Sequence, residues 1–496
     1  MTVPFNNIPQ TVRVPLFYAE MDNSQANGAA AGIRRALLIG QKLAAGSAAV
    51  NVPFIVPSVA SAIALFGRGS MLARMVEKYR ANDTFGELWC IAVADAGAGV
   101  AATGTITVTG NATAAGTLNL YIAGQRVQVP VLLNDTPTLV ATAIVTAITA
   151  ATDLPVSATN AAGVVTLTCK WKGPTGNDIT VLDSFLGSAG GESLPAGVTV
   201  AYVAMAAGAT NPTLTPVIAA MGDDEYDFIG HPFTDTTSLD AFATELNDTT
   251  GRWAWNRMVY GHAYCAQRGT VGTLVAAGQL RNDPHHTIAA VDADCPNPSW
   301  EYASAYTARN AVFLNADVAR PTQTGVLTGI LLPRAGKRFL LTERQSLLTY
   351  GIATSYVAGG SLRVERAITT YQKNTFGQPD VSYLDSETLH TSAYVLRRLR
   401  SIVTSKYPRH KLANDGTRFG PGSAIVTPAV IRGELVSEYA KLEYDGIVEN
   451  ARAFAANLIV ERNSNDPNRL DVLYPPDYIN QLRVFAVLNQ FRLQYA

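Results

Sequence analysis

Hydrophobic and polar positions alternate between two patterns over the first part of the chain. RRALLIGQ (34–41) and ELWCIAVAD (87–95) are apolar runs of strand length, and residues 58–83 between them have helical periodicity. A strand, a helix and a strand within roughly sixty residues predict a βαβ unit and a mixed or parallel sheet. The rhythm returns after residue 208, with strands expected at 226–233, 255–265 and 286–294, a helix opened by a Ser or Thr cap at 237–252, and a helix at 270–283. We therefore expect an α/β core, a mixed sheet flanked by helices, built from residues 33–96 and 208–337.

A stretch of different composition interrupts this rhythm. Residues 96–125 contain no charged side chain and are dominated by Thr, Ala and Gly. GTITVTG, GTLNLYIAG and QRVQVPVLL are strand-like, and Thr136 followed by Pro137 marks the start of one helix. A further strand should place four apolar side chains on one face, namely Val165, Leu167, Cys169 and Trp171. Interruption followed by resumption predicts an inserted β-rich domain at 97–207.

The pattern changes again from Arg338. A helix, a Gly359–Gly360 hairpin and a strand ending at 369–371 are expected first. Residues 386–407 have an amphipathic helical pattern, with Arg397, Arg398 and Arg400 expected largely outside the apolar stripe of Leu389, Ala393, Leu396, Leu399 and Val403. A second helix opening at Thr427–Pro428, a hairpin in 458–475 and a strand at 482–488 complete an expected α+β domain at 338–488.

Both ends of the chain are patterned as strands. Near the start, apolar residues of one parity are interrupted by prolines that exclude a helix, and they are Val12, Val14, Leu16 and Tyr18. Residues 22–32 that follow are small and polar, like a linker. At the other end Phe491, Leu493 and Tyr495 would share one face of an extended strand. Because neither pattern has an evident partner nearby, we expect extended N- and C-terminal strand arms at 1–32 and 489–496.

Composition narrows the possible partners. The 496 residues are 48% hydrophobic and only 16% charged, so either much of the surface faces other protein or apolar cores carry few surface charges. A net charge of −1 without a basic stripe argues against a direct nucleic-acid partner. No signal peptide is expected, and the longest apolar run is too short and too rich in Thr for membrane insertion, so synthesis in the cytoplasm is expected. Four widely spaced cysteines are typical of reduced core thiols.

The motifs that carry chemistry are mostly missing from the sequence. GAGVAA (97–102) fits a dinucleotide pattern, but a strand follows where a helix would be needed. GILLPRAGKRF (329–339) has the wrong spacing for a phosphate loop, and no G-x-S-x-G elbow occurs. His285 and His286 are adjacent, so a strand-entry turn is favoured over a metal site. We expect no catalytic, cofactor-binding or metal residue, and the arginines at 397, 398 and 400 form either a solvated face or a contact with an acidic partner.

Three segments together are familiar: FNNIPQTVRVPLFYAEMDNSQA, LTERQSLLTYGIATSYVAGGSLRVERAITTYQ and DVLYPPDYINQLRVFAVLNQFRLQY. The chain closely resembles, over essentially its full length, the tail sheath subunits of Mu-like contractile bacteriophages. The resemblance implies a virion protein that assembles in the host cytoplasm into hexameric rings stacked helically around a tail tube. It further implies baseplate and tail terminator partners, contraction that drives the tube through the host envelope, no cofactor, and arms that add strands to neighbouring subunits.

The resemblance also implies where the candidate residues lie in the assembly. Val12, Val14, Leu16, Tyr18, Phe491, Leu493 and Tyr495 are then expected at subunit interfaces. Arg397, Arg398 and Arg400 are candidates to face the tube or another partner, and the inserted domain is expected to project outward. An α/β enzyme with an unidentified site and a tail protein that binds the host remain as alternatives.

Overall fold

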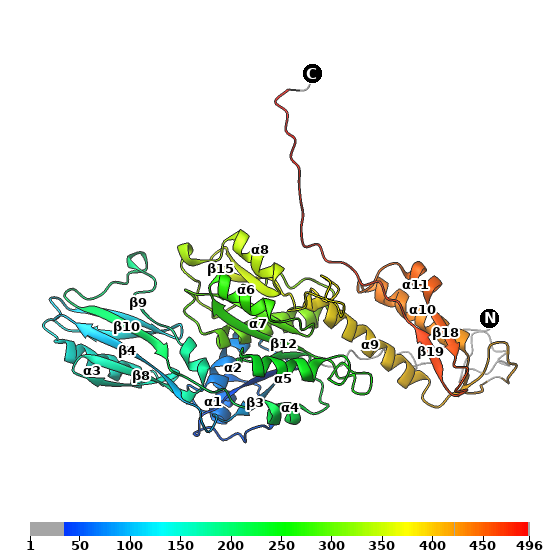
Figure 1. Cartoon of the computed structure of the whole chain (residues 1–496), viewed down its shortest axis with the longest axis horizontal. Helices are drawn as coiled ribbons and strands as arrows, with labels where there is room; N and C mark the ends of the chain where they lie inside the picture. Colours follow the sequence, from blue (N-terminus) through cyan, green and yellow to red (C-terminus); the bar gives the residue numbers. More distant parts are fainter. Residues whose placement is uncertain (1–33, 421, 495–496) are drawn as a thin grey trace, which may run out of the picture. The chain divides into compact units, whose positions relative to one another are not determined.

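The computed structural model describes residues 34–420 and 422–494, which form two compact units (Figure 1). We call residues 34–393, 440–451 and 476–494 the core unit, and residues 394–420, 422–439 and 452–475 the C-terminal unit. The N-terminal candidates Val12, Val14, Leu16 and Tyr18 lie outside the described residues, as does Tyr495. Within the described part of the chain, no helix is both long and apolar enough to span a bilayer.

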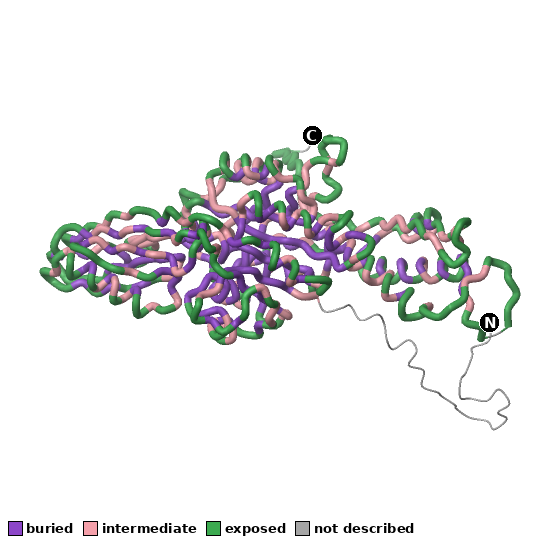
Figure 2. Tube along the Cα trace, turned by 60° about the horizontal axis from the view of Figure 1, so that its bottom comes forward, coloured by how far each residue is buried: buried purple, intermediate pink, exposed green. Residues whose placement is uncertain are grey.

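An eight-stranded mixed sheet organises the core unit, in the order β15-β14-β13-β12-β11-β1-β3-β2. Its strands are β1 (Ala36–Gln41), β2 (Pro53–Ile55), β3 (Leu88–Val93), β11 (Phe228–Gly230), β12 (His262–Gly269), β13 (His286–Asp292), β14 (Ile352–Ala358) and β15 (Ser361–Arg366). The six inner strands are parallel, while β2 and β15 pair antiparallel at the two edges. Strands β1, β3, β11 and β13 are almost wholly buried, as a parallel sheet covered on both faces requires (Figure 2).

Helices cover both faces of this sheet because successive strand residues point to opposite sides. Leu38 and Cys90 belong to the hydrophobic cluster under α1 (Val59–Phe66), α2 (Met71–Asn82) and α7 (Ser299–Ala316). Leu37 and Ile39 on the opposite face pack with α4 (Thr215–Met221) and α5 (Thr236–Leu246). Further along that face lie α6 (Val271–Gln279) and α8 (Leu341–Thr349). The expected α/β core with flanking helices is thus present.

Several expected elements have different bounds in the structure. The helix expected over 58–83 is two helices, because Gly67 and Gly69 take positive φ values of 90° and 75° between them. Helix α5 is capped by the Asp235 side chain and not by Ser or Thr. Strand β12 begins only at His262, so residues 255–261 are not strand. Strands β14 and β15 extend the core sheet, so the boundary expected at residue 338 does not separate them from it.

The inserted segment folds into two antiparallel sheets and one helix. The four-stranded sheet has the order β10-β4-β8-β7 and the three-stranded sheet the order β6-β5-β9. Their elements are β4 (Ala101–Thr109), β5 (Gly116–Ile122), β6 (Gln125–Val131), α3 (Pro137–Ala150), β7 (Val156–Ala161), β8 (Val164–Lys172), β9 (Val181–Asp183) and β10 (Thr199–Ala206). As predicted, the Thr136 side chain caps α3, Pro137 is its first residue, and the four apolar side chains of β8 are buried together.

A buried arginine of the core helices also binds the insertion. The Arg74 guanidinium on α2 contacts the Glu301 carboxylate on α7 at 2.6 Å. The same guanidinium donates to Gln125 at 2.9 Å and to the Asp153 carbonyl at 2.8 Å, both in the insertion. Beside it Trp171 of β8 packs edge-on against Trp300 of α7, with ring centroids 5.5 Å apart. The insertion is therefore fixed to the core by buried contacts as well as by its two chain connections.

The C-terminal unit is formed by helices and two small sheets. Its elements are β16 (Lys411–Leu412), β17 (Ile425–Val426), β18 (Ile459–Arg462), β19 (Leu470–Leu473), α11 (Ala451–Asn457) and the larger parts of α9 (Ser386–Lys406) and α10 (Pro428–Tyr444), which begin or end in the core unit. Within it, Tyr439 stacks on Phe454 at 3.7 Å between ring centroids. The buried face of α9 differs from the expected one, because Val395 and Ile402 are buried while Leu396 and Val403 are exposed.

Short 3₁₀ turns, η1 (Pro174–Asp178), η2 (Ser188–Gly190) and η3 (Ala335–Lys337), complete the described elements. The hairpin expected in 458–475 is confirmed by the antiparallel pairing of β18 with β19. The strand expected at 482–488 is wrong, since residues 480–494 form neither helix nor strand. Figure 1 draws this last stretch as a single trace leading to the C-terminus.

Candidate functional site

The chain is held against the core unit shortly before it ends. The Glu449 N–H donates to the Asp477 carbonyl at 2.9 Å, and the Ile479 N–H donates to the Ile447 carbonyl at 3.2 Å. Two residues further on, the Gln481 side-chain amide donates to the carbonyl of Ala319 at 3.0 Å. Residues 477–481 are thus tied down by backbone and side-chain hydrogen bonds.

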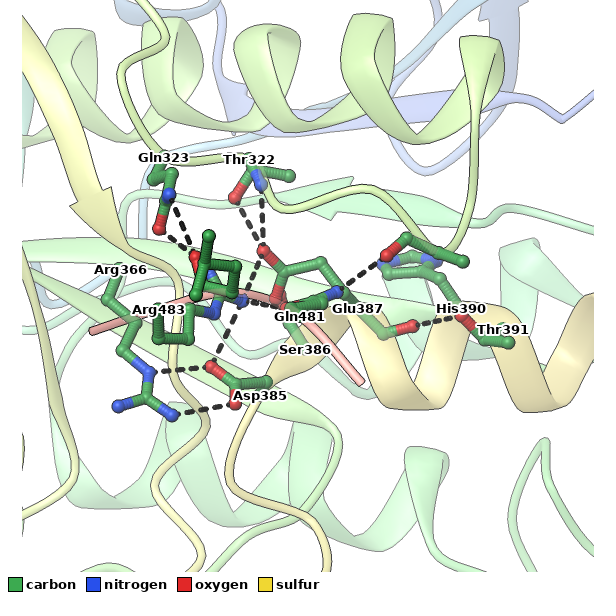
Figure 3. Close-up of polar contacts among 12 residues, drawn as sticks. Thr322, Gln323, Arg366, Asp385, Ser386, Glu387, His390, Thr391, Gln481 and Arg483 are labelled. Carbon is green, nitrogen blue, oxygen red and sulfur yellow. Dashed lines mark hydrogen bonds and ion pairs between the residues drawn. The ribbon is translucent and has the colours of Figure 1, made fainter. Parts of the chain in front are cut away.

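Arg483 ends this tethered segment inside a cluster of charges (Figure 3). Its guanidinium lies 3.2 Å from Asp385 and 3.0 Å from Glu387, at the start of α9. The Arg483 side chain is 11% exposed and that of Glu387 is fully buried. Such charges are stable inside a protein only when they are paired and hydrogen-bonded, so Arg483 is a structural partner of α9 and not a surface residue.

The two carboxylates have further partners that fix their orientation. Thr322 donates to Glu387 through its N–H at 3.0 Å and through its hydroxyl at 2.8 Å. Arg366, the last residue of β15, donates to both oxygens of Asp385 at 2.8 Å. Glu387 also lies in the first turn of α9, where a negative charge favours the helix dipole. We call Thr322, Arg366, Asp385, Glu387 and Arg483 the arm anchor.

Beyond Arg483 the chain is exposed and rich in apolar residues. Val484, Phe485, Val487 and Leu488 are all exposed, and Phe491 follows them. Leu493 is 96% exposed, so it contacts almost nothing in its own subunit. A contiguous run of this kind marks an interaction surface, because it is unfavourable in water. The predicted interface residues Phe491 and Leu493 are therefore available for contact, while Tyr495 is outside the described residues.

The hairpin of β18 and β19 has free strand edges that could accept a further strand. Among the described residues each of its strands has only the other as a neighbour, so two edges carry unpaired backbone groups. Ile459, Val472 and Leu473 on the hairpin are exposed. A two-stranded sheet is marginally stable alone, and an added strand would complete it.

The arginine cluster of α9 is divided by the structure. Arg398 is not on a solvated face, because its Nε donates to the buried carboxylate of Glu438 on α10 at 2.8 Å. Arg397 is half-buried and Arg400 is exposed. The expectation that all three lie outside is therefore wrong for Arg398, which holds two helices together. A contact of Arg397 or Arg400 with a partner remains a prediction.

The adjacent histidines lie at the entry of β13 and point to different surroundings. His285 contacts Asp248 at 2.8 Å, while His286 contacts His231, with 2.9 Å between their Nε2 atoms. Cys265 is the third member of this buried group, whose ligand atoms lie within 4.8 Å of one another. Burial lowers the pKa of His231 to about 3 and raises the pKa of the Cys265 thiol, so these groups are neutral. A hydrogen bond between neutral imidazoles accounts for the histidine pair.

The dinucleotide-like motif GAGVAA (97–102) is not followed by a helix. Gly97 and Gly99 lead into strand β4, which begins at Ala101. A phosphate site would need a helix N-terminus at that point. The strand that the sequence predicts after GAGVAA is confirmed.

Comparisons with known proteins cover most of the chain. Family models for the "Phage tail sheath protein beta-sandwich domain", "Phage tail sheath protein central domain" and "Phage tail sheath C-terminal domain" match residues 97–199, 207–370 and 378–492. The Mu-like prophage FluMu tail sheath protein of Haemophilus influenzae is 42% identical over 495 residues, spanning 99% of this chain and 100% of the relative.

Two solved structures are also similar. A sheath tail protein from Desulfitobacterium hafniense is 11% identical with a TM-score of 0.48, covering 94% of this chain and 100% of that one. A chain of the anti-feeding prophage baseplate in its contracted state is 12% identical with a TM-score of 0.48, covering 98% and 100%. At scores below 0.5 these likenesses support no conclusion about this chain.

Proposed function

Because the chain belongs to the phage tail sheath family and is a structural subunit of a contractile tail, we propose that its copies are joined by exchange of C-terminal strands. As a tail sheath protein it is a virion component. The observation that carries the proposal is the exposed apolar segment 484–494, which begins directly after the arm anchor. We place the start of the C-terminal arm at residue 484, five residues before the position that the sequence pattern alone indicates.

The acceptor in this proposal is the β18–β19 hairpin of a neighbouring subunit. A donated strand satisfies the backbone groups of a free sheet edge, and alternate side chains are buried against the acceptor. Phe491 and Leu493 lie two residues apart and share one face of such a strand. Burying each would contribute about 1.5–3 kcal/mol before ordering costs. The contact is heterologous, so each subunit gives one arm and receives another, and the assembly propagates.

The reach of the arm supports exchange between subunits. Residues 484–494 in extended form span roughly 35 Å at about 3.3 Å per residue. That length exceeds what is needed to lie along one four-residue edge such as β19. The segment can therefore leave its own subunit and still place its terminal residues on a neighbour's hairpin.

The remaining features of the assembly follow from the family and are proposed with it. Copies form hexameric rings stacked helically around a tail tube, assembled in the host cytoplasm, with baseplate and tail terminator proteins at the ends. The N-terminal arm carrying Val12, Val14, Leu16 and Tyr18 joins neighbours in the same way. Arg397 and Arg400 are proposed to face the tube or another partner. Residues 97–207 form the outward surface domain, and the role needs neither catalysis nor a cofactor.

A chain truncated after Arg483 tests the proposal. The arm anchor stays intact in this variant, so the subunit should fold with an unchanged thermal unfolding temperature. We expect no tubes in negative-stain micrographs at concentrations where the full chain forms them. Tubes of normal length from the truncated chain would show that the C-terminal arm does not join the subunits.

A further inference from the structure

We propose that Arg483 is the positioning residue that fixes the donated arm to helix α9. A force on the arm is then transmitted to the arm's own subunit at the start of that helix. This inference rests on the proposed strand exchange. It adds a defined attachment point, where the tethered chain ends and the exposed arm begins.

Arg483 joins the arm to two elements at once. It contacts Glu387 in the first turn of α9, and it shares Asp385 with Arg366 of the edge strand β15. The charges balance, with two guanidinium groups against two carboxylates. Without Arg483, the buried Glu387 would keep only neutral donors, from Thr322 and Ser386, and would lack a cation, so the anchor is strongly favoured in the folded subunit.

The start of α9 is itself held by the core unit. The His390 ring lies 2.9 Å from the Tyr264 hydroxyl and stacks on Phe228 at 4.8 Å between centroids. The Thr391 hydroxyl donates to the Val318 carbonyl at 3.0 Å. An arm attached to this turn is therefore attached to the packed core and not to a loose loop.

Helix α9 connects the arm anchor to the C-terminal unit. The helix continues without a break from the anchored turn at Ser386 to Lys406 in the C-terminal unit, which also carries the β18–β19 hairpin. Under the proposed exchange, each subunit gives its arm from the core unit and receives a neighbour's arm in the C-terminal unit. The helix is therefore a covalent connection between the unit that gives an arm and the unit that receives one.

The test compares hydrogen exchange in full-length assembled sheaths of four proteins. They are the natural chain, Arg483→Gln, the double variant Arg483→Gln/Glu387→Gln, and the control Arg334→Gln, which removes a half-exposed arginine paired with Asp294 in the same unit. The double variant removes both buried charges, so its folding is not burdened by an unpaired carboxylate.

We expect the amides of 477–483 and of the first turn of α9 to exchange at least 10-fold faster in both Arg483 variants. They should be unchanged in Arg334→Gln. Tubes should still form, because residues 484–494 are intact, but they should fall apart at lower urea concentrations than natural tubes. Unchanged exchange in the double variant would overturn the anchor. Failure of strand exchange itself would instead appear as normal tubes from the chain truncated after Arg483.

Discussion

Substitution of Arg74 by Met should weaken the attachment of the inserted segment to the core. Arg74 is 3% exposed and its guanidinium binds Glu301, Gln125 and the Asp153 carbonyl. Met fills a similar volume but leaves the fully buried Glu301 carboxylate with the Asn297 amide, at 2.7 Å, as its remaining side-chain donor. Removing one partner of a buried ion pair costs about 3–5 kcal/mol.

The matched control is Arg68→Met, because Arg68 also contacts Asp153 of the insertion but is far more exposed than Arg74. Arg68 pairs with Asp153 at 2.9 Å, and the side chains are 50% and 45% exposed. An exposed pair contributes about 0–1 kcal/mol, so this variant should lose little. The double variant Arg74→Met/Glu301→Leu should recover part of the lost stability, because neither charge is then buried alone.

Urea unfolding followed by tryptophan emission measures the stability of the contact between the insertion and the core. Trp171 of the insertion and Trp300 of α7 are both buried and in contact beside the ion pair, so their emission reports separation of the two parts. We expect the midpoint of this transition to fall strongly for Arg74→Met and barely for Arg68→Met. Equal midpoints for the two variants would refute the reasoning that the buried Arg74 guanidinium fixes the insertion.

Three further predictions concern the buried groups and the arm. Burial lowers the pKa of His231 to about 3 and lowers those of His262 and His286, so the unfolded state binds more protons below about pH 6.5. Stability should therefore fall on acidification below pH 6.5, by about 1.4 kcal/mol per pH unit from His231 down to about pH 3, with His262 and His286 adding to the fall; equal urea midpoints at pH 7 and 5 would contradict this. All four cysteines are buried, and burial raises the pKa of each thiol, so a thiol reagent at pH 8 should label none in the native protein and four in urea. Leu493→Asp should leave folding unchanged but raise the critical concentration for tube formation at least about 10-fold, the equivalent of losing about 1.5–3 kcal/mol of burial, whereas Gln494→Asp on the other face should change it less.

Local patterns were enough to predict much of the fold. Strands β1, β3 and β13 are short apolar runs, and the start of α3 follows from Thr136 and Pro137. Helix α7 escaped prediction because most of its faces are buried, including Glu301, Ser304 and Thr307. When polar residues of a helix are buried against specific partners, the sequence lacks the amphipathic periodicity that predicts a helix.

The sequence pattern pointed to the exposed C-terminal segment but not to its anchor. Alternation of Phe491 and Leu493 is a local signal, and so is the absence of a partner. Arg483 and Asp385 are 98 residues apart, and nothing in either neighbourhood indicates their contact. Apolar residues at 482–488 suggested a strand, but strand pairing depends on a neighbouring strand, and none of the described strands pairs with this segment.

Cross-linking between two different chains tests strand exchange most directly. One chain carries Leu493→Cys in the arm, and the other carries a single cysteine scanned along β18 and β19, beginning with Val472→Cys. The native thiols are buried and should not interfere. We expect oxidised tubes grown from the mixture to yield a covalent dimer of the two chains. Normal tubes with no such dimer at any hairpin position, or a bond formed within one diluted chain carrying both cysteines, would contradict the account.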